Sequence, residues 1–315
     1  MRKAGLILSL SGAFLAGCSS GPHPDVAQLA PWTRDLRDQQ PEEAFAAIYR
    51  WRGRSLVFVG ANHSTRSDSP TFKLIIDVYG RAHFDTLIAE GFPYARGPDA
   101  PRTLQWLASQ TETDGFVMGG ESVPALRGAI QQGAHIWGGE PDDAVIRDRV
   151  RADGVSDVDL LGFYTLRSVP QWIREKRVVD GGDVRAAALI EGELVRNRSR
   201  LGLTETTLPD YAAWARWYEQ TNGRPFGVTF RLEEVGPLVD GDFNTNRIAA
   251  TVGRARDAFL LKTIADHLTK GENVLVVFGA SHLTILRPAL DRMLGPPCYV
   301  GGTIAQARAT CFDQS

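Results

Sequence analysis

The chain of 315 residues is 43% hydrophobic and 23% charged, which is the balance of an ordinary globular protein. Its 35 basic and 37 acidic side chains give a formal net charge of −2 without any basic block, so nucleic acid is not an expected partner. The length allows one large domain or two modest ones.

The N-terminus has the pattern of a secretory signal peptide. Arg2 and Lys3 precede an apolar run over residues 4–14, which is too short to cross roughly 30 Å of hydrocarbon as a mature helix. Residues 15–18 then read Leu-Ala-Gly-Cys, which resembles the lipobox of bacterial lipoproteins, in which the cysteine is acylated and becomes the first mature residue. The alternative is an ordinary secretory signal with an incidental cysteine.

The lipobox resemblance implies where the protein is held. We expect residues 1–17 to be removed and Cys18 to carry a lipid that anchors the protein to the bacterial cell envelope. Ser19, in place of an acidic residue, favours the outer membrane, with the protein facing the periplasm. Residues 18–40 are rich in proline and charge and are expected to be a tether. No later segment reaches about 18 uninterrupted apolar residues, so the lipid is the expected membrane anchor.

Residues 41–315 are expected to form a single domain in which strands and helices alternate. The strands are predicted from apolar runs rich in branched and aromatic residues, at 55–60, 85–90, 134–140, 273–279 and 298–302. Helices are predicted at 69–79, 122–132, 254–269 and 283–293. This alternation predicts an α/β fold, in which a mostly parallel sheet is flanked by helices.

The middle of the chain, about residues 155–235, has a different pattern. Aromatic residues recur at helical spacing within 163–172 and 211–218, which indicates a helical insertion that covers one end of the sheet. Such aromatics more often pack inside a helical core than bind a ligand. Any that are exposed would line a substrate cleft.

Two predicted strands end in the same short motif. Gly60-Ala-Asn-His63 follows the first strand, and Gly279-Ala-Ser-His282 follows the strand of the C-terminal part. Glycine allows a sharp turn off the strand, and the histidine is expected near the start of the next helix. The repeat predicts two similar halves whose histidines converge on one rim of the sheet, because open α/β sheets bind ligands at the carboxyl ends of their strands. The remaining histidines are read as tether, surface or helix-end residues without a role: His23, His83, His135 and His267.

Glutamates follow the same strand ends. Glu90 ends an apolar strand, which is a costly place for a carboxylate without a partner, and Glu140 ends the next strand in Gly-Gly-Glu-Pro. Glu121 follows two glycines and precedes a helix, so it either joins the site or only interacts with the helix dipole. Imidazoles and carboxylates gathered in this way can bind a divalent metal or run acid–base chemistry near neutral pH.

These motifs together resemble the TraB/GumN/TIKI group, which belongs to a broader superfamily with the erythromycin-esterase-like and ChaN haem-binding proteins. The matching elements are Gly-Ala-Asn-His63, Glu90, Gly-Gly-Glu121, Gly-Gly-Glu140-Pro, Arg256-Asp257 and Phe-Gly-Ala-Ser-His282-Leu. They cover less than half of the mature chain. The resemblance implies an α/β fold with an internal repeat, paired motif histidines His63 and His282, intervening acids Glu90 and Glu140, and an active-site arginine, Arg256.

The residues and the resemblance converge on a hydrolase of a peptide or small-molecule substrate, either a peptidase or an esterase. In a metal-dependent form, His63, Glu90 and His282 would bind Mn²⁺ or a similar ion, which lowers the pKa of bound water. Glu140 would then act as the base, and Arg256 would stabilise the developing oxyanion. In a metal-free form, a histidine or glutamate activates water directly.

The alternative is a haem- or ligand-binding surface lipoprotein similar to ChaN, with a histidine on the iron and the aromatic middle over the ring. A weaker third hypothesis is an envelope partner with a degenerate site. The sequence contains no Gly-x-Ser-x-Gly elbow, His-Glu-x-x-His helix, Walker loop or dinucleotide glycine fingerprint.

Two cysteines remain once Cys18 is assigned to the lipid. Cys298 and Cys311 lie close together near the C-terminus, and in an oxidising envelope compartment we expect them to form a disulfide that closes a short loop. The alternative is a pair of unbonded buried thiols.

Overall fold

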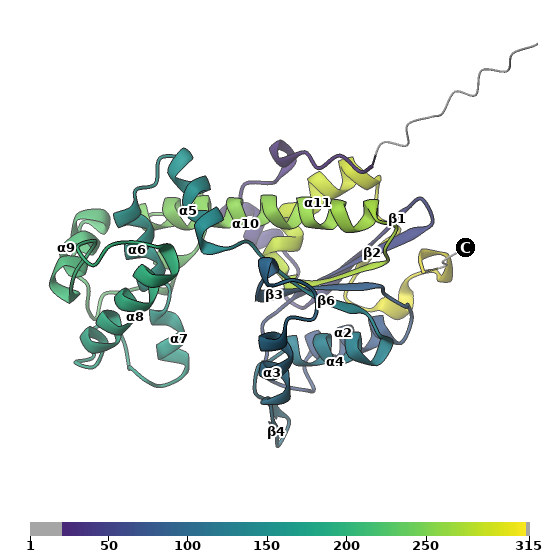
Figure 1. Ribbon diagram of the computed structural model, residues 1–315, viewed down its shortest axis with the longest axis horizontal. Coiled ribbons are helices and arrows are strands. Elements are labelled where there is room, and N and C mark those ends of the chain that lie inside the picture. The colour runs from purple at the N-terminus through teal and green to yellow at the C-terminus, as the bar shows by residue number, and fades with distance from the viewer. Residues whose placement is uncertain (1–20, 313–315) are drawn as a thin grey trace, which may run out of the picture.

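The computed structural model describes residues 21–312, which are built around a six-stranded sheet (Figure 1). The expected signal peptide and the lipidation site at Cys18 lie outside the described residues. The sheet has the order β6-β3-β7-β2-β1-β8. Its strands are β1 (Phe45–Trp51), β2 (Arg54–Ala61), β3 (Thr86–Pro93), β6 (His135–Glu140), β7 (Val274–Gly279) and β8 (Tyr299–Gly301). Four neighbours, β6, β3, β7 and β2, run parallel, so the prediction of an α/β fold with a mostly parallel sheet is confirmed.

Helices cover both faces of the sheet, as Figure 1 shows. One layer contains α2 (Pro70–Tyr79) and α4 (Ser122–Gln132), and the other contains α10 (Asn244–Thr269) and α11 (Ala280–Leu294). Successive residues of a strand point to opposite faces. Val57 and Val59 of β2 accordingly pack in the core under α2 and α4, while Leu56 and Phe58 pack under α10 and α11. Both layers are therefore held by buried apolar contacts from every second residue.

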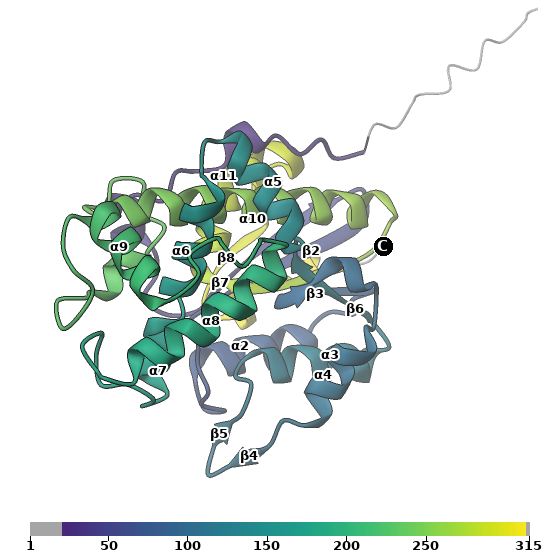
Figure 2. The ribbon, with the colours of Figure 1, turned by 60° about the vertical axis from the view of Figure 1, so that its left-hand side comes forward.

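The helical middle forms its own layer beside the sheet, as predicted (Figures 1 and 2). It contains α5 (Asp143–Ala152), α6 (Asp157–Leu166), α7 (Val169–Arg174), α8 (Ala186–Leu201) and α9 (Tyr211–Asn222). Its core is separate from the cores of the sheet, and the first part of α10 packs into it. Trp172, Trp214 and Tyr218 are fully buried there, so these aromatics pack rather than line a ligand site.

The segment expected to be a tether packs onto the fold over most of its described part. It forms η1 (Val26–Gln28) and α1 (Arg34–Gln39), and Leu29 and Trp32 between them are buried. The backbone N–H of Ala30 donates to α11, and the carbonyl of Trp32 accepts from the loop that precedes α10. The tether prediction is wrong for this packed part of the segment. Its composition is dominated by proline and charge, and it does not reveal that Leu29 and Trp32 are buried in the fold.

The strand β1 was not predicted. It forms an antiparallel hairpin with β2, and the two residues between the strands, Arg52 and Gly53, both have positive φ. A turn of this kind matches the twist of paired strands. Helix α10 also begins ten residues before the predicted start at residue 254, because Gly253 is accommodated inside the helix.

The C-terminal strand β8 pairs antiparallel with β1 at the edge of the sheet. A disulfide joins Cys298, just before β8, to Cys311, as expected from the sequence. The smaller elements are α3 (Pro101–Ala108), β4 (Glu112–Thr113), β5 (Phe116–Val117), η2 (Tyr94–Arg96), η3 (Leu232–Val235), η4 (Ile304–Gln306) and η5 (Ala309–Cys311). In the described range, no helix has both the length and the apolar character needed to cross a membrane.

Candidate functional site

The two Gly-x-x-His motifs meet at one edge of the sheet. β2 and β7 are neighbouring parallel strands, and Ala61 pairs with Gly279 at their carboxyl ends. The space beside Gly279 is bordered by the Nε2 atom of His63, 3.4 Å from an ideal Cβ position on that glycine, and by the ring of His282 at 3.7 Å. A carboxylate oxygen of Glu90 lies 3.5 Å from the same point. Two histidines that are far apart in the chain therefore face each other across the motif glycine.

The motifs match in sequence but differ in structure. After Gly279, helix α11 starts at once, so His282 lies in its first turn and is buried. After β2, helix α2 starts only at Pro70, so His63 lies on a loop and its side chain is 69% exposed. The expectation that each histidine begins a helix is correct for His282 and wrong for His63. The loop makes the His63 ring accessible to solvent.

His63 is oriented by Glu121. Its Nδ1 atom lies 2.5 Å from a carboxylate oxygen of Glu121, and the other oxygen accepts a hydrogen bond from the backbone N–H of Ser64 at 3.2 Å. The hydrogen bond to Glu121 raises the pKa of His63, with a smaller opposing effect of burial. Glu121 makes no capping bond to its own helix α4, so its role at this site goes beyond an interaction with the helix dipole.

The glycines before Glu121 make this contact sterically feasible. Gly120 has a φ of +60°, and a Cβ there would lie 2.9 Å from the carbonyl oxygen of Ser64. Any other residue would be strained and would push the two loops apart. The Gly-Gly-Glu motif is thus explained by the close approach of the Glu121 turn to the His63 loop.

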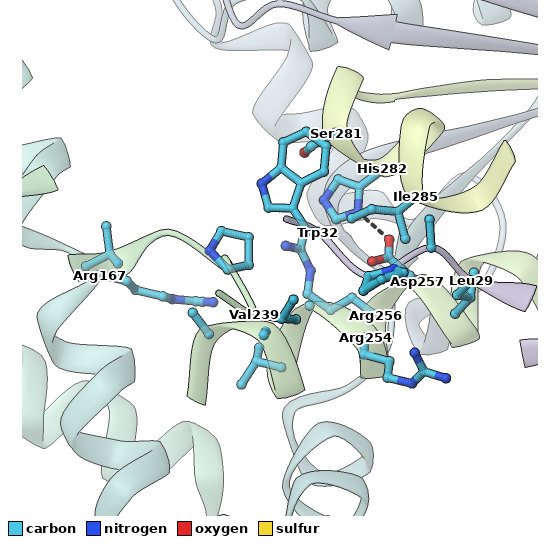
Figure 3. Close-up of a pocket in the computed structure, with 18 of the residues that line it drawn as sticks. Leu29, Trp32, Arg167, Val239, Arg254, Arg256, Asp257, Ser281, His282 and Ile285 are labelled. Atoms are coloured by element: carbon cyan, nitrogen blue, oxygen red, sulfur yellow. Dashed lines mark hydrogen bonds and ion pairs between the residues drawn. The ribbon is translucent and has the colours of Figure 1, made fainter. Parts of the chain in front are cut away.

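His282 is held by a different carboxylate, Asp257 of α10. Its Nδ1 atom lies 2.5 Å from Asp257 Oδ1 (Figure 3). Its Nε2 atom lies 3.5 Å from Glu90 Oε1. Burial alone would lower the pKa of His282, but the negative charges and hydrogen bonds of Asp257 and Glu90 outweigh it and raise the pKa to about 10. We therefore expect His282 to carry a proton at neutral pH. No role was predicted for Asp257 beyond its place in the Arg256-Asp257 element, and no local pattern links it to a histidine 25 residues away.

Arg256 ties the two strand-end glutamates together. It binds Glu140 through two nitrogens, with Nε 2.7 Å from Oε2, and it donates to Glu90 Oε1 at 2.9 Å. Glu90 leaves the regular ladder where the register of β3 and β6 shifts after Ala89, and its Oε2 accepts the N–H of Gly279 at 2.7 Å. Burial would raise the pKa of Glu90, yet His282, Arg256 and His63 lower it well below the usual range. Both glutamates predicted from the sequence thus have the partners that a buried carboxylate needs.

These residues border a cleft between the sheet edge and the helical insertion. The cleft has a volume of about 720 Å³. His63, Glu90, Glu140 and Arg256 line it from the sheet side, while α6, the loop after it, α7 and α8 line it from the insertion. A second, more apolar pocket of about 240 Å³ lies behind Arg256 and His282 and is shown in Figure 3.

This arrangement fits a metal ion poorly. Within residues 21–312, no group of three or more His, Cys, Asp or Glu side chains is placed to hold one. Of the three expected ligands, His282 has its pKa raised by Asp257 and Glu90, so a metal ion would have to displace its proton and compete with these carboxylates. Both oxygens of Glu90 are hydrogen-bonded, one of them to the cationic Arg256. The chemistry open to these residues as arranged is acid–base and electrostatic.

Two histidines that were assigned no role also have carboxylate partners. His135, at the opposite end of β6, is exposed and lies 2.7 Å from Asp99. His267 lies in the last turn of α10, one of the positions expected for it, where it is buried with its Nδ1 atom 2.6 Å from Glu272. Neither histidine lines the cleft, so neither joins the site.

No known protein family, curated protein or solved structure matches this chain. The fold and the site therefore define the class: an α/β protein with two histidine–carboxylate pairs beside a charged cleft at the ends of its parallel strands.

Proposed function

We propose that this protein is a hydrolase that activates water with the His63–Glu121 pair. The observation that carries the proposal is the position of His63: Glu121 holds its Nδ1 atom, while Nε2 faces the neighbouring motif glycine at the strand edge. With the Nδ1 proton donated to Glu121, Nε2 has the free lone pair that a general base needs.

In this proposal, a water in the cleft gives its proton to His63 Nε2 and attacks the carbonyl carbon of an ester or amide. The carbonyl oxygen takes up negative charge, and the two fixed cations near the strand ends, Arg256 and His282, favour it electrostatically. The bond to the leaving group then breaks, and the leaving group takes the proton from His63. Glu90 and Glu140 hold Arg256 in place, so they are positioning residues.

The metal-dependent form predicted from the sequence has less support, because two of its three expected ligands, Glu90 and His282, are bound to Arg256 and Asp257. The haem-binding alternative also has less support. The flat, apolar haem ring needs apolar walls, whereas the cleft is lined mainly by charged and polar side chains. Apart from Tyr164, the aromatic side chains of the insertion do not line this cleft. The TraB/GumN/TIKI resemblance and the lipid anchor stay proposals that rest on the motifs alone.

The test is the hydrolysis of p-nitrophenyl esters and of a peptide mixture by the purified protein. We expect His63→Gln and Glu121→Gln to lower kcat by roughly 10²–10⁴-fold, the usual contribution of a positioned base. The matched control is His135→Gln, which removes an equally exposed histidine with a similar carboxylate partner at the other end of the sheet. Equal activity of His63→Gln and His135→Gln would refute the proposal, as would a failure of the wild-type protein to hydrolyse any of these substrates.

A further inference from the structure

The insertion wall of the cleft contains a cation without a partner. Arg167, which follows α6, lines both the cleft and the apolar pocket behind it. Among the described residues, its guanidinium makes no ion pair and no hydrogen bond. Its ring contact is with Tyr164, where the guanidinium carbon lies 4.1 Å from the ring centroid. A partly buried arginine is normally paired, so this one lacks the group that its position calls for.

The charges around Arg167 increase this imbalance. Two other arginines, Arg256 and Arg200, lie close enough to act on it unfavourably, and Glu140 is the acid that opposes them. Glu140, however, is bound by Arg256. Arg167 therefore lies among other arginines, and the acid that acts on it, Glu140, is already bound, although the cleft as a whole contains acids as well as arginines.

Most of the nearby acids already have partners. Glu90 and Glu140 bind Arg256, Asp143 binds Arg200, and Glu193 binds Arg196. Asp142 is exposed at the start of α5. If one of these paired acids turned to Arg167, an existing ion pair would be broken. An anionic ligand could pair with Arg167 without that loss.

A second observation points to the same place. Tyr164 lines the cleft and is only 1% exposed, and within residues 21–312 its buried hydroxyl has no hydrogen-bond partner. A buried hydroxyl in this state costs free energy unless a ligand or water satisfies it. Figure 3 shows Arg167 extending from the insertion towards Arg256, which places its guanidinium on the side of the catalytic cluster.

We propose that Arg167 and Tyr164 form a subsite that binds an oxyanion of the substrate, a carboxylate or a phosphate. The planar guanidinium can donate two parallel hydrogen bonds to either group, and the tyrosine ring fixes its plane. The inference rests on the proposed function: if the cleft hydrolyses its ligand, the bound anion is part of the substrate, which is then an anionic ester or amide. The binding itself is measured without any turnover.

The test uses inorganic phosphate and succinate as probes, titrated into the protein by calorimetry at low ionic strength. We expect saturable binding of at least one probe to the wild-type protein, and the stronger probe indicates a phosphate or a carboxylate substrate. Arg167→Gln should weaken it roughly 10- to 100-fold, the usual effect of losing hydrogen bonds from a charged group. The matched control is Arg216→Gln, an exposed arginine on α9 of the same insertion, which should bind as the wild type does.

Two further variants keep the test decisive. Arg167→Lys retains the positive charge but lacks the planar guanidinium that donates two parallel hydrogen bonds. It should bind the probes more weakly than the wild type but more tightly than Arg167→Gln. If the glutamine variant does not fold, the lysine variant is compared with the wild type instead. Tyr164→Phe should weaken binding several-fold without loss of thermal stability, because its hydroxyl has no partner to lose. No saturable binding of either probe, or unchanged binding by Arg167→Gln, would overturn the subsite.

The two proposals can fail separately. His63→Gln should lower kcat as stated above and leave phosphate or succinate binding unchanged, because His63 lies on the sheet side of the cleft. Hydrolysis without anion binding would remove the subsite alone. Anion binding by a protein that hydrolyses nothing would remove the hydrolase proposal and leave the subsite in place.

Discussion

The buried pair of Asp257 and His282 makes a strong prediction about stability. Asp257 is 1% exposed and its carboxylate lies 2.5 Å from the imidazole, so we expect His282 to keep its proton well above neutral pH. The substitution Asp257→Asn keeps the shape and removes the charge. The pKa of His282 should then fall from about 10 towards or below its ordinary value of 6.5. Burial lowers this pKa, and after the substitution only Glu90 remains to raise it.

The expected loss in free energy of unfolding follows from the pKa shift of His282. A change from 6.5 to about 10 corresponds to about 5 kcal/mol of interaction with the charged form. Glu90 supplies part of it, so we expect Asp257→Asn to lower the free energy of unfolding at pH 7 by about 3 kcal/mol, within the range for a broken buried ion pair. The matched control is Asp99→Asn, which breaks the exposed pair with His135 and should cost less than about 1 kcal/mol.

The pH dependence has a definite sign. Because the folded-state pKa of His282 is raised, its contribution to stability is complete below pH 6.5 and is lost as pH rises towards about 10. The wild-type protein should therefore lose more stability than Asp257→Asn over this interval. Urea unfolding across the interval and NMR titration of the histidine side chains measure both effects. If His282 titrates near 6.5 in the wild type, or if the two asparagine variants cost the same, the buried imidazolium does not exist.

Three more predictions concern the ion pairs of Arg256, the disulfide and the metal dependence of hydrolysis. Glu140→Gln should lower the free energy of unfolding by about 1–3 kcal/mol in urea, because Arg256 loses one of its two carboxylates while Glu90 stays bound. Cys298→Ser should cost about 2–4 kcal/mol under oxidising conditions and nothing when dithiothreitol is present, because the bridge closes a short loop beside β8. Ester hydrolysis should be unchanged by EDTA; a rate that is lost with the chelator and restored by Mn²⁺ would instead support the metal-dependent form.

The parallel part of the fold could be predicted because its signals are local. The strands β2, β3, β6 and β7 contain apolar runs that are followed by a glycine or glutamate at or near the strand end. The helices α2 and α4 also have start or stop signals in the sequence. Parallel strands in one sheet bring their carboxyl ends to a common edge. The convergence of His63, Glu90 and His282 on Gly279 follows from that geometry alone.

What the sequence did not reveal depends on contacts between distant segments. In the sheet, β7 lies between β3 and β2, although it comes much later in the chain. No local sequence pattern indicates which strands will be neighbours. The same holds for Asp257 and His282 on two different helices, and for Arg167, which is defined by the absence of a partner. In contrast, β1 carried a usable signal: Arg52-Gly53 between two apolar runs is a short hairpin connection.

The two histidines of the repeated motif show how an identical pattern produces two different groups. At His282 the helix starts directly after the strand, so the ring is carried into the core, where Asp257 must neutralise it and where it becomes a fixed cation. At His63 the loop to α2 is long, so the ring stays in solvent and needs Glu121 from another turn to orient it. A base and a fixed positive charge are the two groups that water attack on a carbonyl requires. The length of chain between strand and helix, rather than the motif itself, thus decides which histidine can take each role.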